Sequence, residues 1–490
     1  MEVKQGRHFA RRGAWAVACV SAVYMAGTVA NAQSQTRNPS SQKNPYYGSV
    51  TVRTISEEPL KLSLDDAIRR GLQNNLGLRE AESGEKQFQG EKDQALQQFL
   101  PTINASGGTG VYQHNLVALG FGPSALSNFA TLFPGGVLPP GFSTITKNDL
   151  TQGQVSYDQT LFSGVVISGW KAAGAAARAA YFAKMSARGE VVQQVATAYL
   201  RVIADASEVD NATALQKQDE LAFEDARQAH QAGTLANIDE VRAQVELQTQ
   251  QQTVITAQNA EDKDLILLKR MIGIDPGQKI VLTDPAPYND LAEQTPQEVR
   301  ATAYKNRQDY QNLQNQVAEL RAIHAAYRAQ RLPSLSFNGF YGVQKVNGTP
   351  SHGVFTAMGT LNIPIFREAE IRGETDASAA QLAAVIAQLD DLRGKIDQQV
   401  RSALLDVAAA KKLVEVSKSN VELATQALSD ATDRVNAGVD NTLPLVTAQA
   451  SLARAQRDQV RSMYQYNVSK LALARAAGVV EQQYRAYLGR

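Results

Sequence analysis

The sequence predicts a mainly α-helical protein with a smaller transmembrane β part, made of long antiparallel coiled-coil helices and four β-strands per chain. Three observations lead to this fold class. One pattern of roughly 200 residues occurs twice along the chain. In each copy a polar helical pattern ends at a Leu-Pro pair, Leu100-Pro101 or Leu332-Pro333, because proline disfavours helical backbone in the residue before it. Each pair is followed by alternating polar and apolar residues, as in a strand.

Residues 1–32 have the features of a secretory signal peptide. An apolar run extends from Ala14 to Val29, and Ala30-Asn31-Ala32 fits a cleavage site, so the mature chain is expected to begin near Gln33. The basic residues before the run are Lys4, Arg7, Arg11 and Arg12. Removing these four and one acid changes the formal charge from +1 to about −2, which gives no indication of a nucleic-acid partner.

The only cysteine, Cys19, lies inside this predicted signal peptide. It comes too early in the apolar run to mark the cleavage site of a lipoprotein. The mature chain is therefore expected to contain no disulfide and no thiolate chemistry.

The spacing between the two copies of the pattern changes along the chain. Pro101 and Pro333 are 232 residues apart (333 − 101 = 232), whereas Phe162 and Phe366, which close the second strand of each copy, are 204 apart (366 − 162 = 204). The first copy therefore has an insert between its strands, within residues 116–148. Beyond the strands the spacing settles at 205 (438 − 233 = 205), as two glycine pairs indicate: Gly233 with Gly438, and Gly273 with Gly478.

The predicted organisation follows from these spacings. A polar N-terminal extension at 33–61 precedes a first repeat at 62–273, and a linker at 274–294 leads to a second repeat at 295–478 and a C-terminal tail at 479–490. The expected elements of the first repeat are a helix at 62–99, strands at 102–115 and 150–162 around an outer loop at 116–148, a long helix at 163–231 and a helix at 237–272. Those of the second repeat are a helix at 295–331, strands at 334–346 and 354–366, a long helix at 367–436 and a helix at 442–477.

Capping signatures and heptad spacing support the helices. Ser63 to Asp66 and Thr295 to Glu298 are typical helix starts, the second with proline at the first helical position. The long helices would each reach about 100 Å at 1.5 Å per residue, and they are too polar to cross a bilayer. Apolar residues recur in steps of three and four as a coiled-coil seam: Leu382, Val385, Leu389, Leu392, Ile396, Val400, Ala403, Val407, Ala410 and Val414.

The strands have one apolar and one polar face. Leu335, Phe337 and Tyr341 share a face that we expect to meet lipid, while Ser336 and Asn338 share the other. A soluble antiparallel sheet packed on a core would show the same alternation. The helices have their own seams to fill, however, so little else is available to cover the apolar face. Four strands cannot close a barrel, but three copies of the chain would supply twelve.

The doubled pattern resembles TolC-type outer membrane efflux proteins from about Leu62 to Gly478. The segments that carry the resemblance are "LPTI" and "LPSL", "YDQTLFSG" and "NIPIFREA", "VATAYLRVIA", "HQAGTLANIDEVRAQVEL" and "VNAGVDNTLPLVTAQASLARAQ". The resemblance implies a homotrimer in the cell outer membrane, with a shared 12-stranded barrel and a periplasmic α-helical tunnel. It also implies a passive channel that receives cargo from an inner-membrane transporter through a periplasmic adaptor protein.

Two groups of candidate site residues follow from the resemblance. The helix-to-strand junctions lie where the solvent would change from periplasm to lipid: Leu100, Pro101, Phe162, Leu332, Pro333 and Phe366. The periplasmic aperture would form around Gly233 and Gly438, where each long helix turns back. Asp239 and Glu240 match an acidic position of the family after the first glycine, although they would equally serve to cap the returning helix. After the second glycine, Pro444 and Thr447 stand where acids are expected, and Asp440 is the candidate substitute.

Motifs for catalysis or metal binding are lacking in the sequence. The histidines are scattered and include no pair at ligand spacing: His8, His114, His230, His324 and His352. "GGTG" at 107–110 lies in a predicted strand and not in a phosphate loop. We therefore expect no enzyme and no cofactor. A periplasmic coiled-coil adaptor remains an alternative, as does a channel for type I protein secretion instead of small-molecule efflux.

Overall fold

The structure is a computed structural model that describes residues 43–50, 55–118, 120, 123–133, 135, 143–285, 287–437 and 442–489. The chain divides into two units, Met1–Asn44 and Pro45–Arg490, and the features below belong to the second. The predicted signal peptide, including Cys19, lies outside the described residues.

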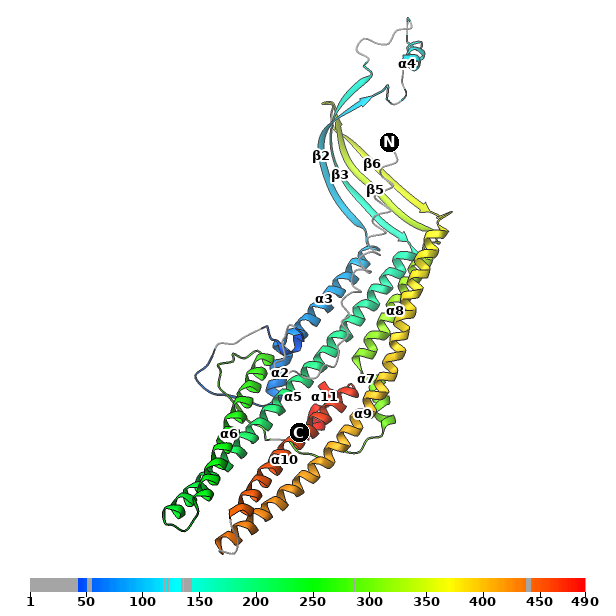
Figure 1. The fold of residues 1–490 in the computed structure, drawn as a ribbon. Helices are drawn as coiled ribbons and strands as arrows, with labels where there is room; N and C mark the ends of the chain where they lie inside the picture. Colours follow the sequence, from blue (N-terminus) through cyan, green and yellow to red (C-terminus); the bar gives the residue numbers. More distant parts are fainter. Residues whose placement is uncertain are drawn as a thin grey trace. The chain divides into compact units, whose positions relative to one another are not determined.

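The second unit is mainly helical, with two groups of strands (Figure 1). Its helices are η1 (Pro45–Tyr47), α2 (Leu64–Asn74), α3 (Leu76–Gln97), α4 (Pro123–Ala130), α5 (Gly164–Gln231), α6 (Asn237–Ile272), α7 (Pro296–Asn306), α8 (Gln308–Ala329), α9 (Glu368–Asn436), α10 (Thr442–Ala476) and α11 (Val480–Leu488). Its strands are β1 (Leu60–Leu62), β2 (Thr102–Asn115), β3 (Ile145–Phe162), β4 (Ile280–Leu282), β5 (Ser334–Val346) and β6 (His352–Asn362).

The first helix of each repeat is interrupted, so the predictions of single helices at 62–99 and 295–331 are wrong. Asn75 separates α2 from α3, and Arg307 separates α7 from α8. Both residues have extended backbone, with ψ angles of 132° and 119°, which ends the ladder of helical hydrogen bonds. The Asn75 side chain then accepts a hydrogen bond from Gly77 N and starts the next helix.

The segments predicted as extension, linker and tail contain ordered elements. Strand β1, in the predicted extension, pairs in parallel with β4, in the predicted linker. Helix α11 occupies the predicted tail, where Val480 and Leu488 are buried in the main core cluster. These elements were missed because each is short and is stabilised by distant parts of the chain instead of by its own periodicity.

The other four strands form one antiparallel sheet in the order β2-β3-β5-β6. Strands β2 and β5 have the predicted bounds. Strand β3 begins at Ile145 instead of at 150, because it stays paired with β2 as far as Asn115, and α4 lies in the segment predicted as a loop. Strand β6 covers His352–Asn362 instead of 354–366, since Asn362 pairs with Ser334 and β5 offers no residue before it.

The core lies among the helices. The main cluster of buried apolar residues includes Val195 and Tyr199 of α5, Met271 of α6 and Leu471 of α10, and it contains no residue of the four-stranded sheet. The predicted seam of α9 is confirmed at Val385, Leu389, Ile396, Val400, Ala403, Ala410 and Val414, all of which are buried. None of the described helices has the length and apolar character needed to cross a membrane.

Candidate membrane-spanning sheet and helical hairpins

The register of the four-stranded sheet gathers its apolar residues on one face. Directly paired residues point to the same side of an antiparallel sheet, and Val155 pairs with Tyr341, which pairs with Phe355. These three side chains are 49%, 69% and 76% exposed although all are large and apolar. The same face carries Ile103, Ala105, Val111, Tyr157, Leu335, Phe337, Val343, Ala357 and Leu361.

The three residues predicted to face lipid all lie on this apolar face. Leu335 pairs with Leu361, and the Phe337 ring meets the Tyr157 ring edge to face at 5.8 Å between centroids. The opposite face is mainly polar and includes Asn104, Ser106, Gln154, Ser156, Asp158, Asn338, Thr356 and Thr360. Its apolar members are Leu150, Phe340, Val346, Val354 and Met358. The main core cluster of the described chain includes no residue of this sheet, so the apolar face of the sheet is left exposed within one chain.

Both edges of this sheet are open. Strands β2 and β6 each pair with one neighbour, and no other strand of the described chain pairs with their outer edges. An open edge exposes unpaired N–H and C=O groups, which a bilayer does not tolerate. A membrane-inserted sheet of this kind therefore requires partner strands.

The predicted junctions of the first repeat meet in the structure. Helix α3 ends at Gln97, before Leu100 and Pro101, and Gln159 of β3 donates a hydrogen bond from Nε2 to the Phe99 carbonyl at 3.1 Å. Phe162 is the last residue of β3, and the following Ser163 caps α5 by accepting a hydrogen bond from Val166 N.

The junctions of the second repeat lie at the same end of the sheet. Leu332 and Pro333 lead from α8 into β5, and a Cβ added at Gly164 of α5 would meet the Leu332 side chain at 3.1 Å. Phe366 is 88% exposed, two residues before α9. Arg331, just beyond the end of α8, forms an ion pair of 2.8 Å with Glu368, the first residue of α9.

The predicted aperture residues of the first repeat form local contacts within one turn. Gly233 has a φ of +73° between α5 and α6. Asp239 pairs with Arg242 at 3.1 Å, and Glu240 lies 3.8 Å from His230 Nε2. Both acids lie in the first turn of α6, where the helix dipole favours negative charge.

The aperture residues of the second repeat are only partly described. Gly438 and Asp440 lie outside the described residues, while Pro444 is exposed in the first turn of α10.

The two helical hairpins, α5–α6 and α9–α10, pack side by side through α5 and α10 (Figure 1). This leaves α6 and α9 as the outer helices, each with an exposed apolar stripe. The α9 stripe is Leu405, Leu413, Val416 and Leu423, which are 52–70% exposed. The α6 stripe includes Val241, Val245, Ile255 and Ile266. Both stripes are spaced for contact with another helix.

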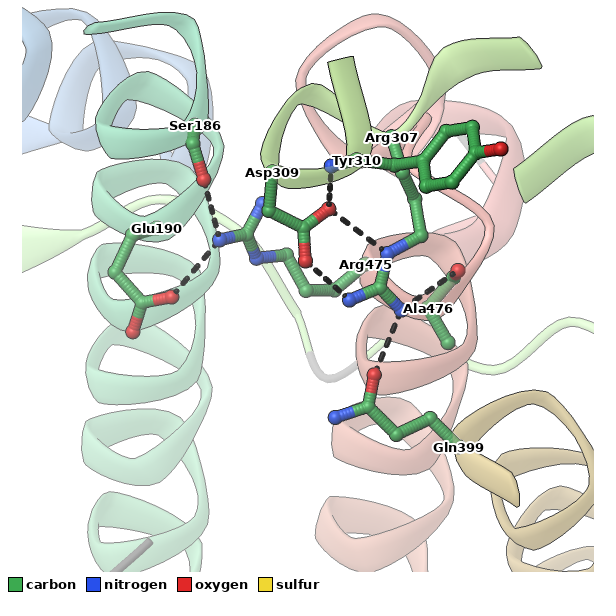
Figure 2. Close-up of polar contacts among 8 residues, drawn as sticks. All are labelled: Ser186, Glu190, Arg307, Asp309, Tyr310, Gln399, Arg475 and Ala476. Atoms are coloured by element: carbon green, nitrogen blue, oxygen red, sulfur yellow. Dashed lines mark hydrogen bonds and ion pairs between the residues drawn. The ribbon is translucent and has the colours of Figure 1, made fainter. Parts of the chain in front are cut away.

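A polar network ties the helices together where α7 meets α8 (Figure 2). Arg307 forms a two-point ion pair with Asp309, from Nη2 at 2.6 Å and from Nε at 3.0 Å. Its Nη1 donates to Gln399 of α9 at 2.7 Å and to the Ala476 carbonyl of α10 at 3.5 Å. Arg475 reaches α5, where Glu190 accepts at 3.3 Å.

The electrostatics of this network favour ionised Asp309. Burial alone would raise the pKa of Asp309, but the hydrogen bonds and charge of Arg307 and the charge of Arg475 outweigh burial, so the net pKa is lowered. Sequence reasoning missed these residues. Arg307 is 232 residues after Asn75 (307 − 75 = 232), so the two helix breaks occupy equivalent positions in the two repeats, although neither residue type marks a break in the sequence.

The described residues contain no group of three or more His, Cys, Asp or Glu that could hold a metal ion. The main features of the candidate site are therefore a sheet with one apolar and one polar face, open at both edges, and the polar helical hairpins that continue from it.

The chain matches the family model described as "Outer membrane efflux protein" over residues 67–274 and 299–479. The toluene efflux pump outer membrane protein TtgF of Pseudomonas putida is 24% identical over 366 residues, which cover 70% of this chain and 72% of that protein.

Two solved structures share the fold. A membrane protein from Pseudomonas aeruginosa is 20% identical, with a TM-score of 0.71, and the match covers 85% of this chain and 93% of that one. The outer membrane protein VceC of Vibrio cholerae is 17% identical, with a TM-score of 0.69, and the match covers 85% of this chain and 96% of that one.

Proposed function

This chain belongs to the outer membrane efflux protein family, and we propose that it works as a homotrimer in which three copies close one twelve-stranded barrel and one helical tunnel. As a member of that family it is an outer membrane channel component of an efflux system and not an enzyme. The observation that carries the trimer is the four-stranded sheet with an exposed apolar face and two open edges.

A cyclic arrangement would satisfy both the sheet and the helices. Strand β6 of one copy would pair with β2 of the next, so every backbone group in the membrane gains a partner. The same rotation would place the exposed stripe of α9 against that of α6 in the neighbouring copy. A single rotation between copies would therefore cover the open edges of β2 and β6 and the exposed apolar stripes of α6 and α9.

The predicted two-repeat organisation fits this arrangement. Each repeat contributes two strands and one helical hairpin, and all four helix-to-strand junctions lie at one end of the sheet. The insert at 116–148 would then lie on the outer surface, at the far end of β2 and β3, and the turns at Gly233 and Gly438 would lie at the periplasmic entrance.

The first experiment is to measure the mass of the mature protein, extracted in mild detergent from purified outer membranes. We expect three times the mass of one mature chain, because four strands cannot close a barrel. A single chain in detergent, or a protein found only in the soluble periplasmic fraction, would exclude the trimeric barrel.

A charge on the apolar face of the sheet should prevent assembly. Val155→Arg is expected to destabilise the membrane-inserted form by about 2–4 kcal/mol, because a basic side chain would have to enter the hydrocarbon. The matched control is Ser156→Arg, one residue along β3 on the opposite face, which we expect to assemble. The measurement is the amount of trimer in the outer membrane fraction. Assembly of Val155→Arg together with failure of Ser156→Arg would reverse the assignment of faces.

The cargo class we propose is small apolar molecules, delivered by a periplasmic adaptor and an inner-membrane transporter. The support for this class is the relative TtgF, which is named for a toluene efflux pump. The test is to express this chain in a host strain that has a toluene efflux pump but lacks that pump's outer membrane channel. Restored toluene tolerance would support the proposal, and unchanged sensitivity despite an assembled trimer would contradict it.

A further inference from the structure

Two carboxyl groups face each other across the α5–α6 hairpin. The Asp205 side chain on α5 is only 11% exposed, and Asp264 faces it from α6. Arg201 Nε lies 3.3 Å from Asp205 Oδ2 and 3.2 Å from Asp264 Oδ2. Since Nε carries a single hydrogen, the two carboxylates share one donor from that atom.

The surroundings of this pair do not supply a second cation. From α10, Tyr464 lies beneath the Arg201 guanidinium at 5.6 Å, and Arg457 is engaged with Glu208 of α5 at 4.0 Å. On α6, one turn before Asp264, the pKa of Glu261 is raised by burial and by the charges of Asp262 and Asp210. Among the described residues, the ion pairs therefore give Asp205 and Asp264 one cation between them, Arg201.

A single proton shared by Asp205 and Asp264 would leave one negative charge opposite the one positive charge of Arg201. A hydrogen bond between the two carboxyl groups requires one of them to be protonated, because two ionised carboxylates have no donor to offer each other. Burial, followed by this hydrogen bond, raises the pKa of Asp205 to about 7, despite the opposing charge of Arg201.

A second buried carboxyl group lies further along the same hairpin, towards its turn. Asp219 of α5 is 7% exposed, and Glu246 is the charged group of α6 that acts on it. Burial and then the charge of Glu246 raise the pKa of Asp219 to about 6. The hairpin therefore contains two levels, at Asp205 and at Asp219, at which ionisation places a buried negative charge on α5.

The second hairpin lacks these acids. At the repeat spacing of 205, Asp205 and Asp264 correspond to Ala410 and Ser469 (205 + 205 = 410, 264 + 205 = 469). Asp219 and Glu246 correspond in the same way to Ala424 and Ser451. The packing supports this alignment, because Ser417 and Ser462 are buried together with their Oγ atoms 2.7 Å apart, where the first hairpin buries Ala212 and Ala257.

We propose that the α5–α6 hairpin tightens in acid and loosens as the pH rises to neutrality, through the facing pair Asp205–Asp264 and the buried Asp219, whereas the α9–α10 hairpin does not respond at these levels. A group whose pKa is raised on folding stabilises the fold fully below its unfolded pKa, here the ordinary Asp value of 3.8. That stabilisation is lost as the pH rises through the folded value of about 7. If α5–α6 forms part of the channel entrance, which rests on the proposed function, one of the two hairpins of each subunit would respond to pH.

Hydrogen–deuterium exchange of the purified full-length mature protein, followed by mass spectrometry, tests the proposal. Exchange times are corrected for the intrinsic dependence of exchange on pH. Between pH 5 and pH 8, segments 205–219 and 246–264 should lose protection by on the order of tenfold, since each unit of pKa shift that is realised changes the opening equilibrium tenfold. The corresponding segments 410–424 and 451–469 serve as an internal control and should change much less.

Three variants separate this mechanism from a general effect of pH. Asp264→Asn, or the double change Asp205→Ala with Asp264→Ser that copies the second hairpin, should reduce the pH response around Asp205. Asp262→Asn removes an exposed acid from the same turn of α6 and should leave the response in place. An equal response in both hairpins, loosening in acid, or an unchanged response in the double variant would overturn the proposal. The mass of the same sample tests the trimer separately.

Discussion

Replacing Arg307 with leucine is expected to lower the free energy of unfolding by about 1.5–3 kcal/mol, because the hydrogen bonds of a buried charged group are lost. Arg307 is 9% exposed and supplies both short contacts to Asp309. Its loss also removes the hydrogen bonds to Gln399 and to the Ala476 carbonyl, which join α7–α8 to α9 and α10 (Figure 2). The measurement is the urea midpoint of helix loss by circular dichroism, in detergent.

The control for Arg307 is Arg227→Ala, which breaks an exposed pair with Glu224 at 2.9 Å. We expect it to cost at most about 0.5 kcal/mol, as usual for surface pairs on one helix. Similar midpoints for the two variants would show that the Arg307 network does not hold the helices together.

The Arg307 variant should also change the dependence of stability on pH. In the native protein the pKa of Asp309 is lowered, so its contribution is present above the ordinary value of 3.8 and is lost only in stronger acid. Without Arg307, only the charge of Arg475 and the hydrogen bond from Tyr310 N still oppose burial, so the pKa of Asp309 rises. The Arg307→Leu variant is therefore expected to lose less stability at pH 5 than at pH 7. A loss of unfolding free energy that is equal at pH 5 and pH 7 would contradict this role for Asp309.

The substitution Gly478→Ala is expected to cost about 2–5 kcal/mol. Gly478 has a φ of +77°, which strains any residue with a Cβ by about 1–2 kcal/mol. An added Cβ would also lie 2.7 Å from Arg307 N and 2.8 Å from the Asn306 carbonyl carbon. Backbone cannot move aside as a flexible side chain does, so overpacking adds about 1–3 kcal/mol.

The matched control for Gly478 is Gly233→Ala. Gly233 has a similar φ of +73°, but no atom lies within 4 Å of an added Cβ. We expect this variant to cost only the backbone strain, about 1–2 kcal/mol. The difference between the two urea midpoints isolates the contact of Gly478 with the Arg307 break, and equal midpoints would exclude a contribution from that contact.

The long elements could be predicted from the sequence because their periodicity extends over many residues. Helix α6 and strands β2 and β5 have the bounds that the pattern indicates, and the apolar face of the sheet follows from the two-residue repeat of its strands. The helix breaks could not be predicted. Neither Asn75 nor Arg307 is a glycine or a proline, and at Arg307 the contacts to Gln399 and to the Ala476 carbonyl come from distant residues.

Features that depend on pairing between distant segments were also missed. Strands β1 and β4 are three residues each and pair across more than 200 residues of sequence. The facing acids Asp205 and Asp264 become neighbours only when α5 and α6 pack in one register. The predicted aperture residues Asp239 and Glu240, by contrast, lie near one another in sequence, and the structure adds only their contacts with Arg242 and His230.

The start of α2 has a consequence for the order of folding. Leu64 N donates to Asp284, and Asp65 accepts from Tyr484 of α11, so contacts at this one point have sequence separations of 220 and 419 residues. The entropy of closing such long loops must be overcome before these contacts form, whereas each helical hairpin closes over a turn of a few residues. We therefore expect the hairpins to fold early and locally, and the contacts of α2 with Asp284 and with α11 to form late.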